Sequence, residues 1–285
     1  MLIPRSLLVF KLAALVTVIV GTILFFHETS APNLGRPLKW DCSSTTLPSF
    51  HGAQTYNDTK IFIGIFTTKE KAERRQMIRD TYLQYKPENI EYKFVMVANH
   101  IPKSLQQEID DYNDILRINM TRENMNEGKT YEYFRTMAER KDDKFDFVLK
   151  ADDDSYLHLD RMEYDLSHTN RNMSYWGYLV GDTFMGGLCY GLSFDLVEWI
   201  ADAPIPRRYK SGHEDSQVQK WFRWSNIDEQ VNYEVRNCRI HDYIDSGSFY
   251  SKEIELDNTM IVHYLKSDDH FLDTHETLSS TYQSK

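Results

Sequence analysis

The stretch "FDFVLKADDDSYLHL", residues 145–159, places three consecutive aspartates directly after an apolar segment with one polar interruption. Successive strand residues point to opposite faces, so Asp152 and Asp154 would share one side if the extended chain continues, with Asp153 opposite. Two carboxylates on one side suit a hard divalent cation, which takes oxygen ligands and is commonly completed by substrate phosphates. The alternative is a solvated turn in which Asp154 or Ser155 caps the following helix.

Strand-like and helix-like segments alternate before these aspartates. The sequence predicts strands over 60–68, 92–99, 115–120 and 145–154, and helices over 69–85, 101–113 and 128–141. Thr67 and Thr68 are candidate caps for the first helix. The alternation predicts an α/β domain with a parallel sheet and helices on both faces. In such sheets, ligands bind beyond the carboxyl ends of the strands, and the three aspartates lie at such an end.

The N-terminal segment has the composition of a membrane anchor. Residues 6–26 are predominantly apolar, with Lys11 as their one charged residue, and about 20 such residues are enough to span a bilayer as a helix. Basic residues on the N-terminal side predict a cytosolic tail over 1–5 and a lumenal location for the rest. A cleaved signal peptide is the alternative, although its apolar core is usually shorter. Residues 27–58 are predicted to form a stem, which leaves 59–285 as one lumenal domain.

Cysteines and sequons agree with a lumenal location. In an oxidising compartment we expect Cys189 to pair with Cys238, which leaves Cys42 free or available to link a homodimer. Three buried thiols are the alternative. Three sequons are candidate glycosylation sites: Asn57, Asn119 and Asn172.

The overall charge narrows the class of partner. The chain has a net charge of −10 at pH 7. Nucleic-acid binding relies on concentrated Lys and Arg, so a general polyanion binder is disfavoured. A small phosphorylated ligand in a local pocket remains compatible with this charge.

Five motifs occur in a characteristic order along most of the predicted lumenal domain. They are "ERRQMIRDTY" (73–82), "LKADDDSYL" (149–157), "GGLCYGLSFDLVEWI" (186–200), "HEDSQV" (213–218) and "IVHYLK" (261–266). Together they resemble the beta-1,3-galactosyltransferase family, glycosyltransferase family 31. The resemblance implies a GT-A fold with a Rossmann-like central sheet, a nucleotide-sugar donor, a divalent metal and a Golgi anchor. Tyr82 stands where the family usually has Trp, and Ser216 where Val follows Glu-Asp, which leaves the acceptor open.

The resemblance also implies roles for the aspartates and one histidine. Asp154 would be the main metal ligand and His263 the second, while Asp152 and Asp153 would contact the ribose or sugar of the donor, or metal-bound water. An imidazole ligand favours Mn2+ over Mg2+. The alternative for His263 is a hydrogen-bonded histidine on an alternating strand.

The motif at 213–218 supplies a candidate general base. Asp215 would remove the proton of the acceptor hydroxyl in a single displacement with inversion. Glu214 is predicted beside it at the acceptor, and Trp176 is a further candidate for an acceptor wall. The alternatives are that both carboxylates merely cap a helix, and that the indole belongs to the core.

Three basic residues are candidates for contacts with the donor. Arg75 and Arg79 lie four residues apart, so they share a helix face and could approach a diphosphate. The alternative is that they form structural salt bridges with Asp80 or Glu73. Lys129 matches the position of a lysine in the family.

These expectations combine into a predicted function. The sequence predicts a single-pass type II Golgi membrane glycosyltransferase that moves galactose or N-acetylglucosamine from a UDP-sugar to a glycan on a glycoprotein or glycolipid. The product would carry a beta-1,3 linkage. The alternatives are a transferase of the same fold with another donor, such as a galactofuranosyl or fringe-like enzyme, and an inactive relative that binds glycan.

Overall fold

The computed structural model describes residues 55–282, except residues 57, 98, 144 and 182. The predicted tail, the predicted membrane anchor, Cys42 and Asn57 lie outside the described residues. Within the part of the chain that is described, no helix is both long enough and apolar enough to cross a bilayer.

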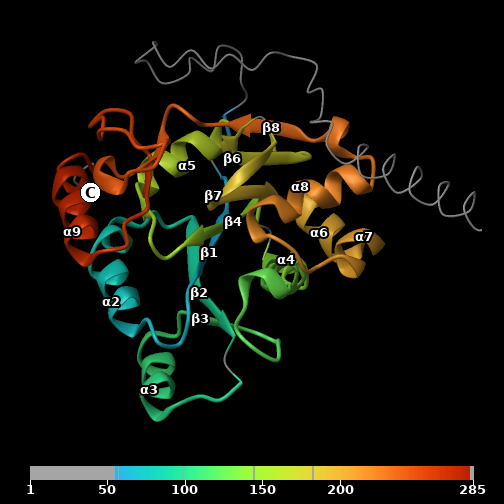
Figure 1. The fold of residues 1–285 in the computed structure, drawn as a ribbon, viewed down its shortest axis with the longest axis horizontal. Helices are drawn as coiled ribbons and strands as arrows, with labels where there is room; N and C mark the ends of the chain where they lie inside the picture. The colour runs from blue at the N-terminus through green and yellow to red at the C-terminus, as the bar shows by residue number, and fades with distance from the viewer. Residues whose placement is uncertain (1–54, 57, 98, 144, 182, 283–285) are drawn as a thin grey trace, which may run out of the picture. The chain divides into compact units, whose positions relative to one another are not determined.

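A seven-stranded mixed sheet forms the centre of the domain (Figure 1), with the strand order β3-β2-β1-β4-β7-β6-β8. Strand β1 pairs in parallel with β2 and β4, as predicted, but β7 runs antiparallel to β4 and to β6. The purely parallel sheet is therefore wrong, because β6 and β7 are joined by a short turn instead of a helical crossover. The strands are β1 (Ile61–Phe66), β2 (Ile90–Val97), β3 (Ile115–Ile118), β4 (Phe147–Asp152), β6 (Ser174–Val180), β7 (Phe184–Ser193) and β8 (Asn232–Val235).

Helices cover both faces of this sheet, as the alternating pattern predicts. Figure 1 shows α4, α6 and α8 on one side and α2, α5 and α9 on the other. The N-cap of α2 is Lys71 instead of Thr67 or Thr68, and α2 ends at Asp80, where a 3-10 turn (Tyr82–Tyr85) follows. The helices are α2 (Ala72–Asp80), α3 (Lys103–Tyr112), α4 (Lys129–Ala138), α5 (Leu159–Ser167), α6 (Phe194–Asp202), α7 (Pro204–Arg208), α8 (Glu214–Trp224) and α9 (Asp268–Ser279).

The buried strands β1 and β4 send alternate side chains into two separate layers. Ile61, Ile63 and Ile65 join a core that includes residues of α2, α5 and α9. Phe66 points to the opposite layer, where its ring lies edge-on to Tyr133 of α4 at 5.1 Å. A strand buried on both faces has an almost continuous apolar sequence. This is why β1 and β4 could be predicted as strands from the sequence.

A second, three-stranded sheet brings the C-terminal part of the chain to the end of β4. Its order is β5-β10-β9, with β5 (Tyr156–Leu157), β9 (Ile240–Asp242) and β10 (Ile261–His263). His263 lies in register with Asp242 on the neighbouring parallel strand. The backbone N–H of Leu265 donates to the carbonyl of Asp154 over 3.0 Å. Segments far apart in the sequence thus meet where the three aspartates lie.

Candidate active site

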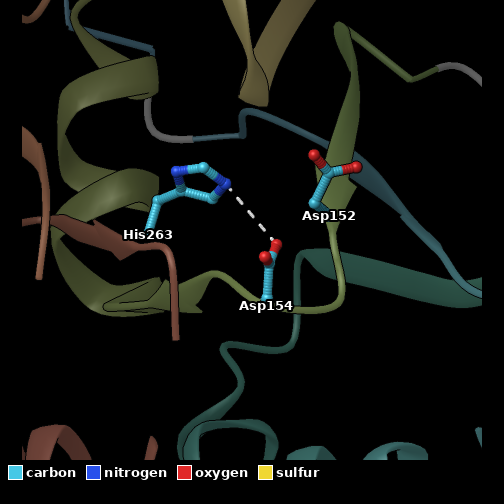
Figure 2. Close-up of side chains that lie close together, drawn as sticks. All are labelled: Asp152, Asp154 and His263. Carbon is cyan, nitrogen blue, oxygen red and sulfur yellow. Dashed lines mark ion pairs between the residues drawn. The ribbon is translucent and has the colours of Figure 1, made fainter. Parts of the chain in front are cut away.

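Three side chains converge at the end of β4 in an arrangement that could hold a metal ion. Asp152 ends the strand, Asp154 lies in the following turn and His263 ends β10, and one ligand atom from each lies within 4.8 Å of the others. Figure 2 shows the His263 imidazole directed at the Asp154 carboxylate, with Asp152 at the end of β4. The chain turns after Asp152 instead of staying extended, because Ser155 N–H donates to the Asp152 carbonyl over 3.2 Å. The two carboxylates nevertheless stay together.

Asp242 orients the histidine of this cluster. His263 Nδ1 lies 2.6 Å from Asp242 Oδ1, which places Nε2 3.5 Å from Asp154 Oδ1. Burial lowers the pKa of His263, but the hydrogen bond to Asp242 and the charge of Asp154 raise it more, so the net shift is upward. Metal-binding histidines commonly donate their second ring N–H to a carboxylate. Two carboxylates and one oriented imidazole nitrogen fit a divalent ion such as Mn2+.

A buried lysine forms ion pairs with Asp152 and with Glu214. Lys150 Nζ lies 2.7 Å from Asp152 Oδ1 and 3.3 Å from Glu214 Oε2, and it donates to the Gly187 carbonyl over 2.5 Å. Burial lowers the pKa of Lys150, but the two carboxylates raise it more, so the ammonium stays charged. Lys150 therefore offsets part of the negative charge and connects β4 to β7 and α8. Lys150 is the polar residue that interrupts the apolar part of β4, and its role in the site was not predicted from the sequence.

The two acidic residues at the start of α8 have different surroundings. Glu214 is buried and accepts a hydrogen bond from Thr130 Oγ1 over 3.1 Å. Burial raises the pKa of Glu214 to about 8 despite the Lys150 ammonium, and a hydrogen bond with Asp215 contributes. Asp215 instead lines a cavity of about 370 Å³ together with Asp152 and Asp154. Asp215 thus lines the cavity, and its role as general base stays a prediction. The placement of Glu214 at the acceptor is wrong because its carboxyl is buried in the interior.

A second cavity adjoins the same aspartates. It has a volume of about 400 Å³ and is lined by Asp152 and Asp154 with Asp153, Lys71 and Lys129. Lys71 Nζ lies 2.7 Å from Asp153 Oδ1. The other oxygen, Asp153 Oδ2, is buried and finds no hydrogen-bond partner among the residues that the structure describes. A buried polar atom without a partner is uncommon, so this oxygen is a candidate for contact with a ligand.

Lys129 lies in the wall of this second cavity. Its Nζ donates to the Thr67 carbonyl over 2.9 Å and to Glu123 Oε1 over 2.6 Å. Lys71 and Lys266 were missed by sequence reasoning, and both line a further cavity of about 410 Å³ with Asp153 and Asp154. The cluster of Asp152, Asp154 and His263 is therefore flanked by basic side chains on this side.

The two arginines predicted to contact the donor are structural. Arg75 makes two hydrogen bonds to Glu108 of α3, at 2.8 and 2.6 Å. Arg79 bonds Glu108 and also Asp114, at 2.7 to 2.9 Å. The prediction is wrong because both guanidinium groups face α3, where burial requires carboxylate partners. The salt-bridge alternative is correct in kind, although the partners are not Asp80 and Glu73.

Two further predictions fail because the side chains belong to the core. Trp176 is buried, and its Nε1 donates to Asp165 over 2.7 Å, so it is not part of an acceptor wall. Among the described residues Cys189 is a buried free thiol, so the predicted disulfide with Cys238 is wrong. Cys189 sits on β7 opposite Ala151, inside the apolar core. Asn119 and Asn172 are exposed, and their glycosylation stays a prediction.

Comparison with known proteins gives the class of protein. Residues 73–182 match the family model described as Galactosyltransferase. Mouse beta-1,3-galactosyltransferase 6 is 30% identical to this chain, over 67% of this chain and 70% of the mouse protein. The chain is therefore a glycosyltransferase. It belongs to the beta-1,3-galactosyltransferase family, glycosyltransferase family 31, as its motifs predicted.

Similarity to solved structures is more distant. An active-site mutant of LgtC is 11% identical, with a TM-score of 0.48, over 79% of this chain and 97% of LgtC. The mannosyltransferase PcManGT of Pyrobaculum calidifontis, solved with GDP-Man and Mn2+, is 11% identical. Its TM-score is 0.46, over 78% of this chain and 64% of that one.

Gly187 provides a test of where Asp215 must lie. A Cβ at this position would overlap the Asp215 carboxylate, with 2.8 Å to its Cγ and 2.9 Å to Glu214 Oε2. We expect Gly187→Ala to rotate the Asp215 side chain and to lower sugar transfer by roughly tenfold or more, because misplacing a catalytic group by about 1 Å has effects of that size. Gly186→Ala is the control, since its Cβ would lie 3.3 Å from Val180 Cγ2, a close contact that a shift of this side chain by a few tenths of an ångström relieves. Equal activity of both variants would contradict the position assigned to Asp215.

Proposed function

We propose that this chain is an inverting, metal-dependent hexosyltransferase of the GT-A fold. It would transfer galactose or N-acetylglucosamine from a UDP-sugar to a glycan acceptor and form a beta-1,3 linkage. The observation that carries this proposal is the cluster of Asp152, Asp154 and His263, whose two aspartates line both a cavity with Lys71 and Lys129 and a cavity with Asp215. Membership of the family supports the choice of donor and linkage.

The cavity with basic side chains is suited to the nucleotide part of the donor. Lys129 and Lys71 provide positive charge, and the unpaired Asp153 Oδ2 is available as an acceptor for a ribose hydroxyl. Lys266, next to the cluster, is suited to a phosphate oxygen. Asp152, Asp154 and His263 would hold a divalent cation, which when bound stabilises the charge of the departing diphosphate as a Lewis acid.

Asp215 would act on the other side of the cluster. Its carboxylate takes the proton of the acceptor hydroxyl while that oxygen forms a bond to the anomeric carbon of the sugar. The bond from this carbon to the diphosphate oxygen breaks at the same time, and the anomeric configuration inverts. Glu214 contributes by position: burial raises its pKa, so it holds a proton more readily than an exposed carboxyl, and the protonated form can donate to Asp215.

The location of the enzyme is part of the same proposal. The apolar segment 6–26, with the basic Arg5 and Lys11 at its N-terminal end, supports a type II anchor with the domain in the Golgi lumen. The exposed Asn119 and Asn172 sequons are compatible with glycosylation in that compartment. Another donor on the same fold is the main alternative.

A panel of nucleotide sugars tests the proposal. The full chain in detergent is incubated with Mn2+, one donor at a time and a mixture of glycan acceptors, and released UDP is measured. We expect UDP release from UDP-galactose or UDP-N-acetylglucosamine, abolished by a chelator and restored by Mn2+, and a product whose new linkage is beta-1,3 by NMR. Turnover of a different donor would overturn the donor assignment. Absence of turnover with every donor would favour an inactive glycan-binding relative.

A further inference from the structure

Aromatic rings form one wall of the cavity that contains Asp215. Tyr178, Phe184 and Tyr250 line this cavity. The rings of Tyr178 and Tyr250 are edge-on at 5.4 Å, and Phe249 continues the row, edge-on to Tyr250 at 5.5 Å. Phe249 is 94% exposed. Single exposed apolar residues are common, but an aromatic row that extends from a polar cavity to the surface is typical of a ligand site.

The segment that carries these rings is fixed to the metal-ligating cluster. The backbone N–H of Asp242 donates to the Tyr250 carbonyl over 3.1 Å, and the N–H of Lys252 donates back to the Asp242 carbonyl over 3.2 Å. The side chain of Asp242 also orients His263. One residue therefore determines the positions of both the imidazole and the aromatic row, so the distance between them is set by the fold.

The charged groups that face this cavity restrict what the rings can bind. Negative charge comes from Asp152, Asp154, Asp215 and Asp242, and the basic groups on the same lining are Lys266, His241 and His263. A divalent cation would offset the first two carboxylates, which leaves Asp215 and Asp242 against one lysine. An anionic ligand at the aromatic row would meet no surplus of positive charge, whereas a neutral ligand would not be repelled.

We propose that Tyr178, Tyr250 and Phe249 form a stacking surface for a neutral pyranose of the acceptor, next to the hydroxyl that Asp215 activates. This inference rests on the proposed function. A pyranose presents C–H groups on one face and hydroxyls around its edge, so the face packs on aromatic rings while the hydroxyls reach polar groups. Phe249, at the outer end of the row, would contact the sugar or its aglycone furthest from the reacting bond.

Direct binding tests this proposal without requiring turnover. Methyl β-D-galactopyranoside and methyl β-D-N-acetylglucosaminide are titrated into the full chain with Mn2+ and UDP, and binding is followed by saturation-transfer NMR. We expect Phe249→Ala to raise the dissociation constant of a neutral glycoside by roughly tenfold, since one aromatic contact contributes up to about that factor. Phe249→Tyr should keep the wild-type value. Leu272→Ala, at a side chain of α9 that is also about half exposed (47%), is the control and should change nothing.

Two results would overturn the stacking surface. One is equal binding of every neutral glycoside by wild type and Phe249→Ala, and the other is tighter binding of methyl β-D-glucopyranosiduronic acid than of the neutral glycosides. UDP release by donor hydrolysis is measured in parallel in the wild type and in the Leu272→Ala control. Failure of donor hydrolysis in the wild type would count against the proposed enzyme, whereas loss of the Phe249 effect with donor hydrolysis intact counts only against the stacking surface.

Discussion

Asp215→Asn is expected to reduce sugar transfer by roughly 10²–10⁴-fold, the range that general base catalysis contributes. The amide has nearly the same shape as the carboxylate but cannot accept the proton of the acceptor hydroxyl. Asp215 lines the first cavity together with Asp152 and Asp154, whereas the second cavity shares these two aspartates but is not lined by Asp215. The affinity for UDP, measured by calorimetry, is therefore expected to stay within about twofold of wild type.

The matched control for this substitution is Asp269→Asn. Asp269 is the second residue of α9, as Asp215 is of α8, so both changes remove the same favourable charge from the first turn of a helix. Asp269 is exposed, so Asp269→Asn should leave the rate of sugar transfer unchanged. Loss of UDP affinity in Asp215→Asn would move this residue from catalysis to donor binding, and full activity would remove it from the mechanism.

Asp154→Ala is expected to lower transfer more than about 100-fold, because Lewis-acid stabilisation of the leaving group is worth several kcal/mol. The fold should survive this change. The Asp154 side chain pairs with His263 at 3.5 Å, and its backbone carbonyl, which accepts from Leu265, is retained in alanine. Initial rates over a range of Mn2+ concentrations, with thermal unfolding measured alongside, provide the test. Wild-type rates in the variant would exclude Asp154 as a metal ligand.

Asp152→Ala would be a less specific test than Asp154→Ala. Asp152 forms an ion pair with the buried Lys150 at 2.7 Å, so its removal leaves the lysine with less compensating charge in the interior. Breaking one partner of a buried pair destabilises a protein by about 3–5 kcal/mol. Lost activity in Asp152→Ala would therefore not distinguish unfolding of the domain from loss of a metal-binding carboxylate.

Local sequence patterns were sufficient for much of the fold. The apolar strands β1 and β4 and the following helices were predicted because burial on both faces gives them long apolar segments. The antiparallel direction of β7 was not predicted, because it depends on the length of the β6–β7 connection and not on the residues of β7. The position of Asp154 and His263 came from motifs, since the contact between β4 and β10 is formed by tertiary packing.

The failed site predictions have a common physical reason. From the sequence alone, Arg75 and Trp176 were predicted to contact a ligand. In the structure, their N–H groups donate hydrogen bonds to Glu108 and Asp165 instead. Which face of a helix or strand lies inside depends on neighbours that are distant in sequence. Asp242 was missed for the same reason, because its hydrogen bond with His263 joins β9 and β10, which pair only in the folded chain.

The most direct test of the metal-dependent site is the affinity of the full chain for UDP with and without Mn2+, measured by isothermal titration calorimetry in wild type, Asp154→Ala and Asp269→Ala. We predict that Mn2+ strengthens UDP binding by at least about tenfold in wild type and Asp269→Ala. In Asp154→Ala this gain should disappear while the domain remains folded. The same UDP affinity with and without Mn2+ in the wild type, or an undiminished Mn2+ effect in Asp154→Ala, would contradict the assignment of Asp152, Asp154 and His263 as the site that joins a cation to the donor diphosphate.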